Sequence, residues 1–115
     1  MMPPQPPVAC NHTVFTKEQR DAYRDIWRKL ETCLLAAGPI EAGCRYDFPG
    51  DADTLRLVHE WVSLERRCCP FITFTVVAGH EQQPVQLLLT GDETAWNFLQ
   101  HELTAQIRRL AEPSE

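Results

Sequence analysis

Apolar residues recur every three or four positions in the first third of the chain and predict a helix. They are Tyr23, Ile26, Trp27, Leu30, Cys33, Leu34 and Ala37, which share one face of a helix that extends to about residue 37. Thr16 and Gln19 have the spacing of a capping box, which predicts where this helix begins. The Gly38-Pro39 pair is predicted to end it.

A strict alternation of apolar and polar residues over positions 40–48 predicts a half-buried strand. Its apolar face carries Cys44, Tyr46 and Phe48. After the turn at Pro49-Gly50, Asp51 is a suitable N-cap for a second helix that runs to about Cys68. Pro70 ends this helix and biases Cys69 away from helical geometry.

Two β-branched and aromatic segments, residues 71–78 and 85–90, predict a hairpin. Asp92 is predicted to cap a last helix that runs to about residue 111. The order is therefore α-β-α-β-β-α and the fold class is α+β: a small three-stranded sheet, antiparallel or mixed, with helices packed on one face. The other face carries Phe71, Val77 and Leu88, and such a face is often covered by a second subunit, which suggests a homodimer.

Composition limits the size and the partners of the protein. The 115 residues are 43% hydrophobic, which is typical of a single domain with a core of its own. We expect a proline-rich flexible arm over 1–7, one α+β domain over 8–112 and a polar tail over 113–115. The net charge of −5 argues against a nucleic-acid partner. No segment resembles a membrane span or a secretory signal, so we expect a cytoplasmic protein without a membrane partner.

One carboxylate in the second helix falls on the apolar side of the helical wheel. Glu65 lies near the middle of that arc, and it precedes Cys68 and Cys69 by three and four residues, the spacing at which helical side chains meet. Trp61, four residues earlier, is expected to cover the same place. An ionised carboxylate is costly to bury without partners. Alternatively, Glu65 reaches solvent or pairs with an arginine, and the two cysteines are core thiols.

The chemistry of this group favours a soft cation. A disulfide between the adjacent cysteines is disfavoured because their Cα atoms lie closer than a normal bridge requires. A catalytic thiolate is also disfavoured, since a helix C-terminus and a neighbouring carboxylate both raise a thiol pKa. A bound metal reverses this balance, and thiolates select zinc, copper(I), mercury or arsenic(III).

Adjacent cysteines cannot close a four-ligand site, so a further donor is needed. Cys10 and His12 are the donors expected from the segment after the proline arm. Cys44 is a second candidate donor, but its alternation with Tyr46 and Phe48 favours packing in the core, where Cys33 is also expected. The other histidines are expected in solvent; they are His59, His80 and His101.

The segment from Trp61 to Phe74 resembles a motif, L-E-R-x-C-C-P-F-x-x-F, of small, largely uncharacterised bacterial proteins. Position by position, the resemblance keeps Cys10, Glu65, Cys68 and Cys69. Cys44 stands where that family is expected to have an aromatic residue, and Thr94 where it often has glycine. Related Cys-Cys-Pro-Phe segments occur near mercury-resistance and metal-responsive proteins, so the resemblance implies a soft-metal theme without an established activity.

Three functions remain open from the sequence. The first is the binding of a soft metal or metalloid ion through Cys68, Cys69, Cys10 and Glu65. The alternative is a non-catalytic dimeric interaction module in which the Cys-Cys-Pro-Phe segment is a packing motif. The third is a thiol-dependent enzyme whose candidate catalytic residues are Glu65, Cys68 and Cys69.

Overall fold

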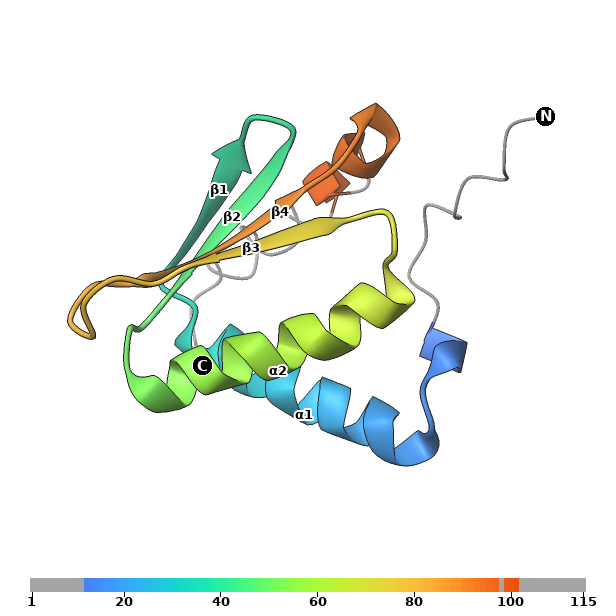
Figure 1. Cartoon of the computed structure of the whole chain (residues 1–115), viewed down its shortest axis with the longest axis horizontal. Coiled ribbons are helices and arrows are strands. Elements are labelled where there is room, and N and C mark those ends of the chain that lie inside the picture. Colours follow the sequence, from blue (N-terminus) through green and yellow to red (C-terminus); the bar gives the residue numbers. More distant parts are fainter. Residues whose placement is uncertain (1–11, 98, 102–115) are drawn as a thin grey trace, which may run out of the picture.

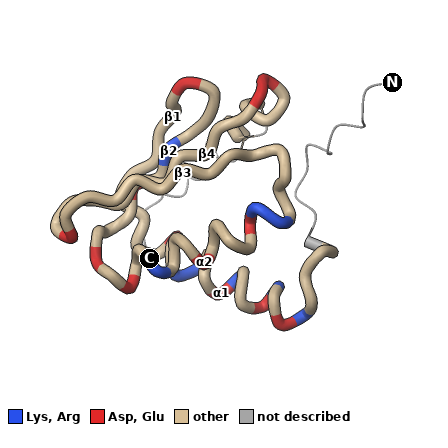
Figure 2. The backbone as a smooth tube through the Cα atoms, in the orientation of Figure 1, with Lys and Arg blue, Asp and Glu red and all other residues tan. Residues whose placement is uncertain are grey.

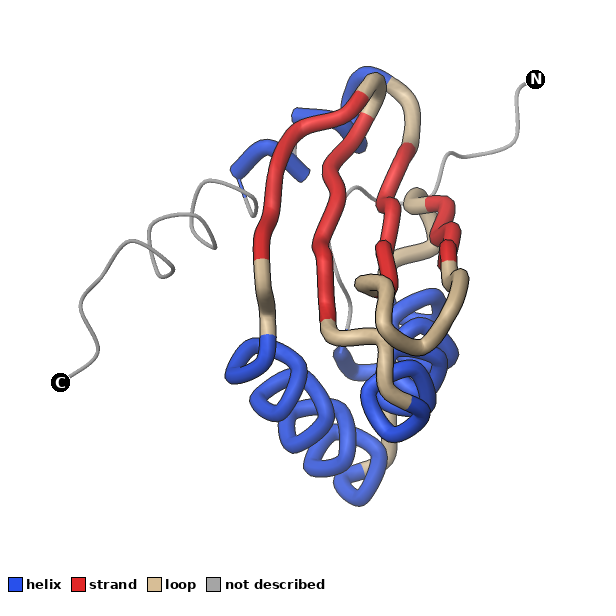
Figure 3. Tube along the Cα trace, turned by 90° about the vertical axis from the view of Figure 1, so that its left-hand side faces the viewer, coloured by secondary structure: helices blue, strands red, loops and turns tan. Residues whose placement is uncertain are grey.

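A computed structural model describes residues 12–97 and 99–101 and shows an α+β fold with two layers (Figure 1). Two long helices lie together on one side of a four-stranded antiparallel sheet (Figure 3). The helices are α1 (Lys17–Cys33) and α2 (Ala52–Cys68), and a short 3-10 helix, η1 (His12–Val14), precedes them. The strands are β1 (Ala36–Ile40), β2 (Gly43–Phe48), β3 (Thr73–Val77) and β4 (Val85–Thr90), in the spatial order β1-β2-β4-β3.

Helix α1 begins where the sequence predicts and ends earlier. The Thr16 hydroxyl accepts from the Gln19 backbone N–H at 3.1 Å, and the Gln19 side chain accepts from the Thr16 N–H at 3.0 Å. This confirms the capping box. The helix ends at Cys33, so the prediction that it continues to residue 37 is wrong. Residues 36–40 form β1 instead, and Gly38-Pro39 lies inside a strand.

The additional strand changes the predicted sheet. Residues 36–48 form a hairpin, β1 and β2, around a turn in which Ala42 has a φ of 61°. The prediction of one strand over 40–48 is therefore wrong, as are the three-stranded sheet and the order α-β-α-β-β-α. Proline is tolerated in β1 because this strand lies at the edge of the sheet, where a missing N–H leaves no neighbouring strand unpaired.

The remaining elements follow the predicted pattern. Asp51 caps α2 by accepting from the Thr54 backbone N–H at 3.1 Å. β3 and β4 pair as the predicted hairpin, although β3 is shorter than predicted. Asp92 accepts from the Ala95 N–H at 2.9 Å at the start of a helical segment over residues 93–97 and 99–101. The predicted continuation to residue 111, the proline-rich arm and the polar tail lie outside the described residues.

The core fills the space between the helix pair and one face of the sheet. The inward face of β2 carries Cys44, Tyr46 and Phe48, as the alternation predicts, and each is buried. Helix α1 packs beside α2, and Trp27 meets Tyr46 edge-on with ring centroids 6.4 Å apart. On the opposite face of the sheet, Val77 is 45% exposed. Among the described helices, none has both the length and the apolar character of a membrane span.

Candidate metal centre at the carboxyl end of helix α2

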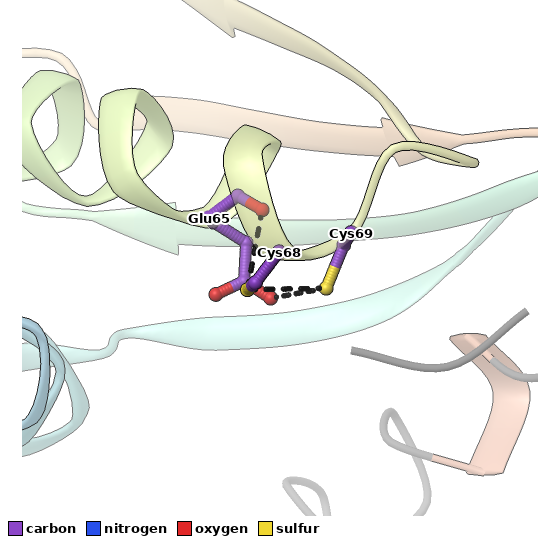
Figure 4. A group of neighbouring side chains, drawn as sticks. All are labelled: Glu65, Cys68 and Cys69. Atoms are coloured by element: carbon purple, nitrogen blue, oxygen red, sulfur yellow. Dashed lines mark hydrogen bonds between the residues drawn. The ribbon is translucent and has the colours of Figure 1, made fainter. Parts of the chain in front are cut away.

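Glu65, Cys68 and Cys69 form a compact buried group at the end of α2 (Figure 4). One carboxylate oxygen and the two sulfur atoms all lie within 4.8 Å of one another. The sulfur atoms are 3.7 Å apart, and Cys69 Sγ lies 2.9 Å from Glu65 Oε1. Both cysteines are fully buried and Glu65 is 6% exposed. The structure therefore brings together the three donors predicted from helical spacing.

Local backbone geometry explains why both sulfur atoms point to the same carboxylate. Cys68 occupies the last position of α2, and Cys69 is its C-cap, with φ −123° and ψ 70°. The Cys69 N–H donates to the Glu65 carbonyl at 2.8 Å, which closes the final helical turn. The Cys68 thiol donates to the same carbonyl at 3.4 Å. The departure of Cys69 from helical geometry is the one that Pro70 predicts.

Tyr23 is a member of this group that sequence reasoning placed only in the core. Its hydroxyl donates a hydrogen bond to Glu65 Oε2 from helix α1. The second carboxylate oxygen, Oε1, faces Cys69. A tyrosine predicted to lie in the core is the sequence signal for such a contact, because a buried tyrosine O–H usually has a hydrogen-bond partner. The identity of that partner is a long-range property that helical spacing does not give.

Aromatic side chains of α1, α2 and β3 pack against one another, and Tyr23, the hydrogen-bond partner of Glu65, belongs to this set. Trp61 packs on Trp27 with ring centroids 4.9 Å apart and meets Phe74 edge-on at 5.9 Å. Phe15 lies 5.6 Å from Tyr23. The Trp61 indole N–H is buried and has no hydrogen-bond partner of normal geometry among the described residues. Such a site has a low effective dielectric constant, so the free energy of a charged group there depends strongly on the groups next to it.

The buried environment raises the pKa of two groups beside Glu65, Cys68 and Tyr23. Burial, followed by the negative charge of Glu65, raises the pKa of Cys68 to about 12, and a backbone hydrogen bond opposes this only in part. Burial also raises the pKa of Tyr23, and the charge and the hydrogen bond of Glu65 add to the shift. Both groups are therefore protonated at neutral pH. A thiol in this state is a weak nucleophile.

The two cysteines differ in redox state. Cys69 is disulfide-bonded, whereas Cys68, Cys44 and Cys33 are free thiols. A disulfide sulfur carries no proton and is not a thiolate ligand. In the reduced protein, the Cys69 S–H would be the donor in its 2.9 Å contact with Glu65 Oε1. The complete group of three donors therefore exists only after reduction.

The other candidate residues lie apart from this group or outside the described part. Cys10 precedes the described residues, and of His12 only the backbone, at the start of η1, is described. Cys44 is fully buried in β2, as expected, and Cys33 is only partly buried against the core. The remaining histidines, His59, His80 and His101, are exposed, as expected.

Two arginines follow Glu65 directly and lie on the outer side of α2. Arg66 and Arg67 are exposed, and they form the blue segment at the end of this helix in Figure 2. Arg67 donates to the Val14 carbonyl at 3.3 Å, and its guanidinium lies 5.5 Å from the centroid of the Phe15 ring. The segment next to η1 is thereby fixed against the end of α2 that carries the cysteines.

Comparison with known proteins gives no match: no family model, no curated protein and no solved structure is significantly similar to this chain. The donor atoms of Glu65, Cys68 and Cys69 are therefore the basis on which a function is assigned.

Proposed function

We propose that the reduced protein binds a soft metal or metalloid ion at the end of α2. Cys68 and Cys69 supply thiolates, and Glu65 supplies a carboxylate oxygen. The observation that carries this proposal is the clustering of all three donor atoms within 4.8 Å in a buried site. A buried carboxylate between two thiols is costly in an apolar core and becomes favourable when a cation joins it.

The distances support this proposal. Two thiolates bound tetrahedrally to zinc at about 2.3 Å lie about 3.8 Å apart. The two sulfur atoms are 3.7 Å apart. A carboxylate oxygen on the same ion would lie about 3.6 Å from each sulfur, whereas Glu65 Oε1 is 2.9 Å from Cys69 Sγ. To share an ion, the carboxylate oxygen would have to move away from Cys69 Sγ, from 2.9 Å to about 3.6 Å.

The donor types favour soft ions over hard ones. Two sulfur ligands select zinc, copper(I), mercury(II) or arsenic(III), whereas magnesium and calcium prefer oxygen. The ion also supplies the positive charge that this place lacks, because a helix C-terminus and a carboxylate both oppose the thiolate form. The bound ion replaces the thiol protons, which makes binding dependent on pH.

The alternative is a non-catalytic module in which Cys68, Cys69 and Pro70 serve packing alone. The full burial of both cysteines favours it, since buried cysteine behaves as a small hydrophobic residue. In that case, replacement of both cysteines lowers stability and changes no binding property. A thiol-dependent enzyme is disfavoured by the raised pKa of Cys68.

Native mass spectrometry of the reduced protein separates these functions. Zinc, mercury(II) and a trivalent arsenical are added in turn, with a small competing thiol present. We expect a one-to-one adduct that Cys68→Ser removes. The matched control is Cys33→Ser, which replaces a free, partly buried cysteine outside the site. A folded Cys68→Ser variant with unchanged affinity would overturn the metal proposal and favour the packing module.

A further inference from the structure

Strand β3 forms an edge of the sheet that lacks the usual protection against pairing. It lies outermost in the order β1-β2-β4-β3, and its register with β4 runs without a bulge from Thr73 to Val77. Its sequence, Thr-Phe-Thr-Val-Val, contains no charged residue and no proline. Natural sheets use such residues to keep an exposed edge from pairing with another strand. The opposite edge, β1, does contain a proline, Pro39.

The core is incompletely covered along the edge that β3 forms. Phe74 faces the helices, since its ring meets Trp61 edge-on at 5.9 Å, and Val76 lies on the same face of the strand. Both are only half-buried. Their partners on β4, Leu89 and Leu87, are 5% and 0% exposed. β4 has a strand on each side and β3 has one, so a further strand beyond β3 would bury the apolar surface still exposed there.

We infer that β3 pairs with the β3 of a second copy of the chain, antiparallel and about a twofold axis at Thr75. This arrangement places Thr75 opposite itself, Phe74 opposite Val76 and Thr73 opposite Val77. Thr–Thr pairs and pairs of an aromatic with a β-branched residue stabilise antiparallel strands. The two four-stranded sheets then form one continuous sheet, with the helices of both copies on the same face.

The charges at the two ends of β3 support a second copy as the occupant. Arg66 lies near the end of α2, before β3 begins, and Glu81 lies in the turn after β3 ends; Figure 2 shows them in blue and in red at opposite ends of the strand. Both are exposed, and neither belongs to an ion pair in the described part of the chain. The twofold axis exchanges the two ends, so Glu81 of the second copy lies on the side of Arg66 of the first. A parallel arrangement would bring like charges together instead.

Substitution of Thr75 tests this edge, because this residue faces its own copy. Its side chain is exposed, so Thr75→Lys and Thr75→Glu both fit the folded monomer. We expect the reduced, unsubstituted chain to sediment as a dimer. Either variant alone should dissociate about 5-fold more readily, because like charges directly opposite each other destabilise a strand pair. An equimolar mixture of the two variants should restore the dimer, with one copy of each.

The matched control is Gln86→Lys, which adds the same charge to the same face of the sheet on β4, opposite Val77. It should leave association unchanged. A chain that sediments as a monomer overturns the inference. A dimer that both Thr75 variants leave unchanged also overturns it, and sensitivity to Gln86→Lys alone would assign the interface to the exposed face of the sheet.

Two further measurements do not depend on the folding of the Thr75 variants. In the unsubstituted chain, amide hydrogen exchange in β3 should slow as the protein concentration rises, while exchange in β1 should not change. Exchange in β3 that is independent of concentration overturns the pairing. Arg66→Glu and Glu81→Arg should each weaken the dimer by up to about 5-fold, and the double variant should recover it. A double variant weaker than either single variant overturns the antiparallel register.

Discussion

The Tyr23 hydroxyl donates a hydrogen bond to Oε2 of Glu65, although 42 positions separate the two residues in the chain. This bond connects α1 to the last turn of α2. It also occupies one carboxylate oxygen, so that the other faces Cys69. A partner that orients a metal ligand in this way typically contributes about 10- to 100-fold to metal affinity.

Replacing Tyr23 by phenylalanine removes this donor and keeps the ring. We expect Tyr23→Phe to lower the free energy of unfolding by about 1–3 kcal/mol, because a buried acceptor loses its partner. Metal affinity should fall by about 10-fold. Chemical denaturation and metal titration measure the two effects. In a Glu65→Leu background the same substitution should cost little stability; an equal cost in both backgrounds would show that the bond contributes nothing.

Metal affinity should rise with pH. The pKa of Cys68 is raised to about 12 by burial and by Glu65, so at neutral pH the ion must displace its proton. Each displaced proton increases the apparent affinity about 10-fold per pH unit. Zinc titration against a chelator of known pH dependence measures this slope. Cys68→Ser should reduce the slope, and a slope of zero for the unsubstituted protein contradicts thiolate ligation.

The reduced protein should lose stability in alkali. Folding raises the pKa of Cys68 from 9.0 to about 12, so between these values the folded state holds more protons than the unfolded state. This contribution is complete below pH 9 and is lost as the pH rises toward 12. Denaturation curves over that window measure it. Cys68→Ala should flatten the decline, and an identical decline in both proteins would assign it to other groups, Tyr23 first among them.

Alkylation of the folded, reduced protein should spare Cys68. Its thiol is fully buried and its pKa is raised to about 12. Cys33 is more accessible and should react first. Mass spectrometry after timed treatment with iodoacetamide gives the order of modification. Rapid modification of Cys68 with a plateau below pH 7 would instead indicate an activated nucleophile and favour the enzyme hypothesis.

The pairing of β2 with β4 should depend on a glycine. A Cβ at Gly43 would collide with the Leu89 carbonyl, whereas a Cβ at Gly38 in the neighbouring strand would meet only the Arg45 guanidinium at 3.7 Å. We expect Gly43→Ala to lower the free energy of unfolding by about 1–3 kcal/mol, a cost typical of overpacking. Gly38→Ala is the control and should have a much smaller effect. Equal effects would contradict the register of the sheet.

Local signals in the sequence determined the elements that carry most of the site. The N-caps at Thr16 and Asp51 act on backbone groups three residues away, and helical periodicity puts Glu65, Cys68 and Cys69 at one end of α2. The β3–β4 hairpin likewise joins segments that are close in the chain. These interactions span few residues, so the residue pattern was enough to predict them.

Only the tertiary structure decided the rest. Apolar spacing through Ala37 fits a helix face as well as it fits a strand, and the choice is made by pairing with β2, which places Ala37 opposite Tyr46. The partner of the Glu65 carboxylate comes from another helix. The Tyr23–Glu65 bond joins residues 42 positions apart. Ala37 and Tyr46 are close in the chain, but β1 and β2 belong to a sheet whose other two strands come from much later in the sequence. The free energy of both contacts therefore exists only once the sheet and the helix pair have assembled.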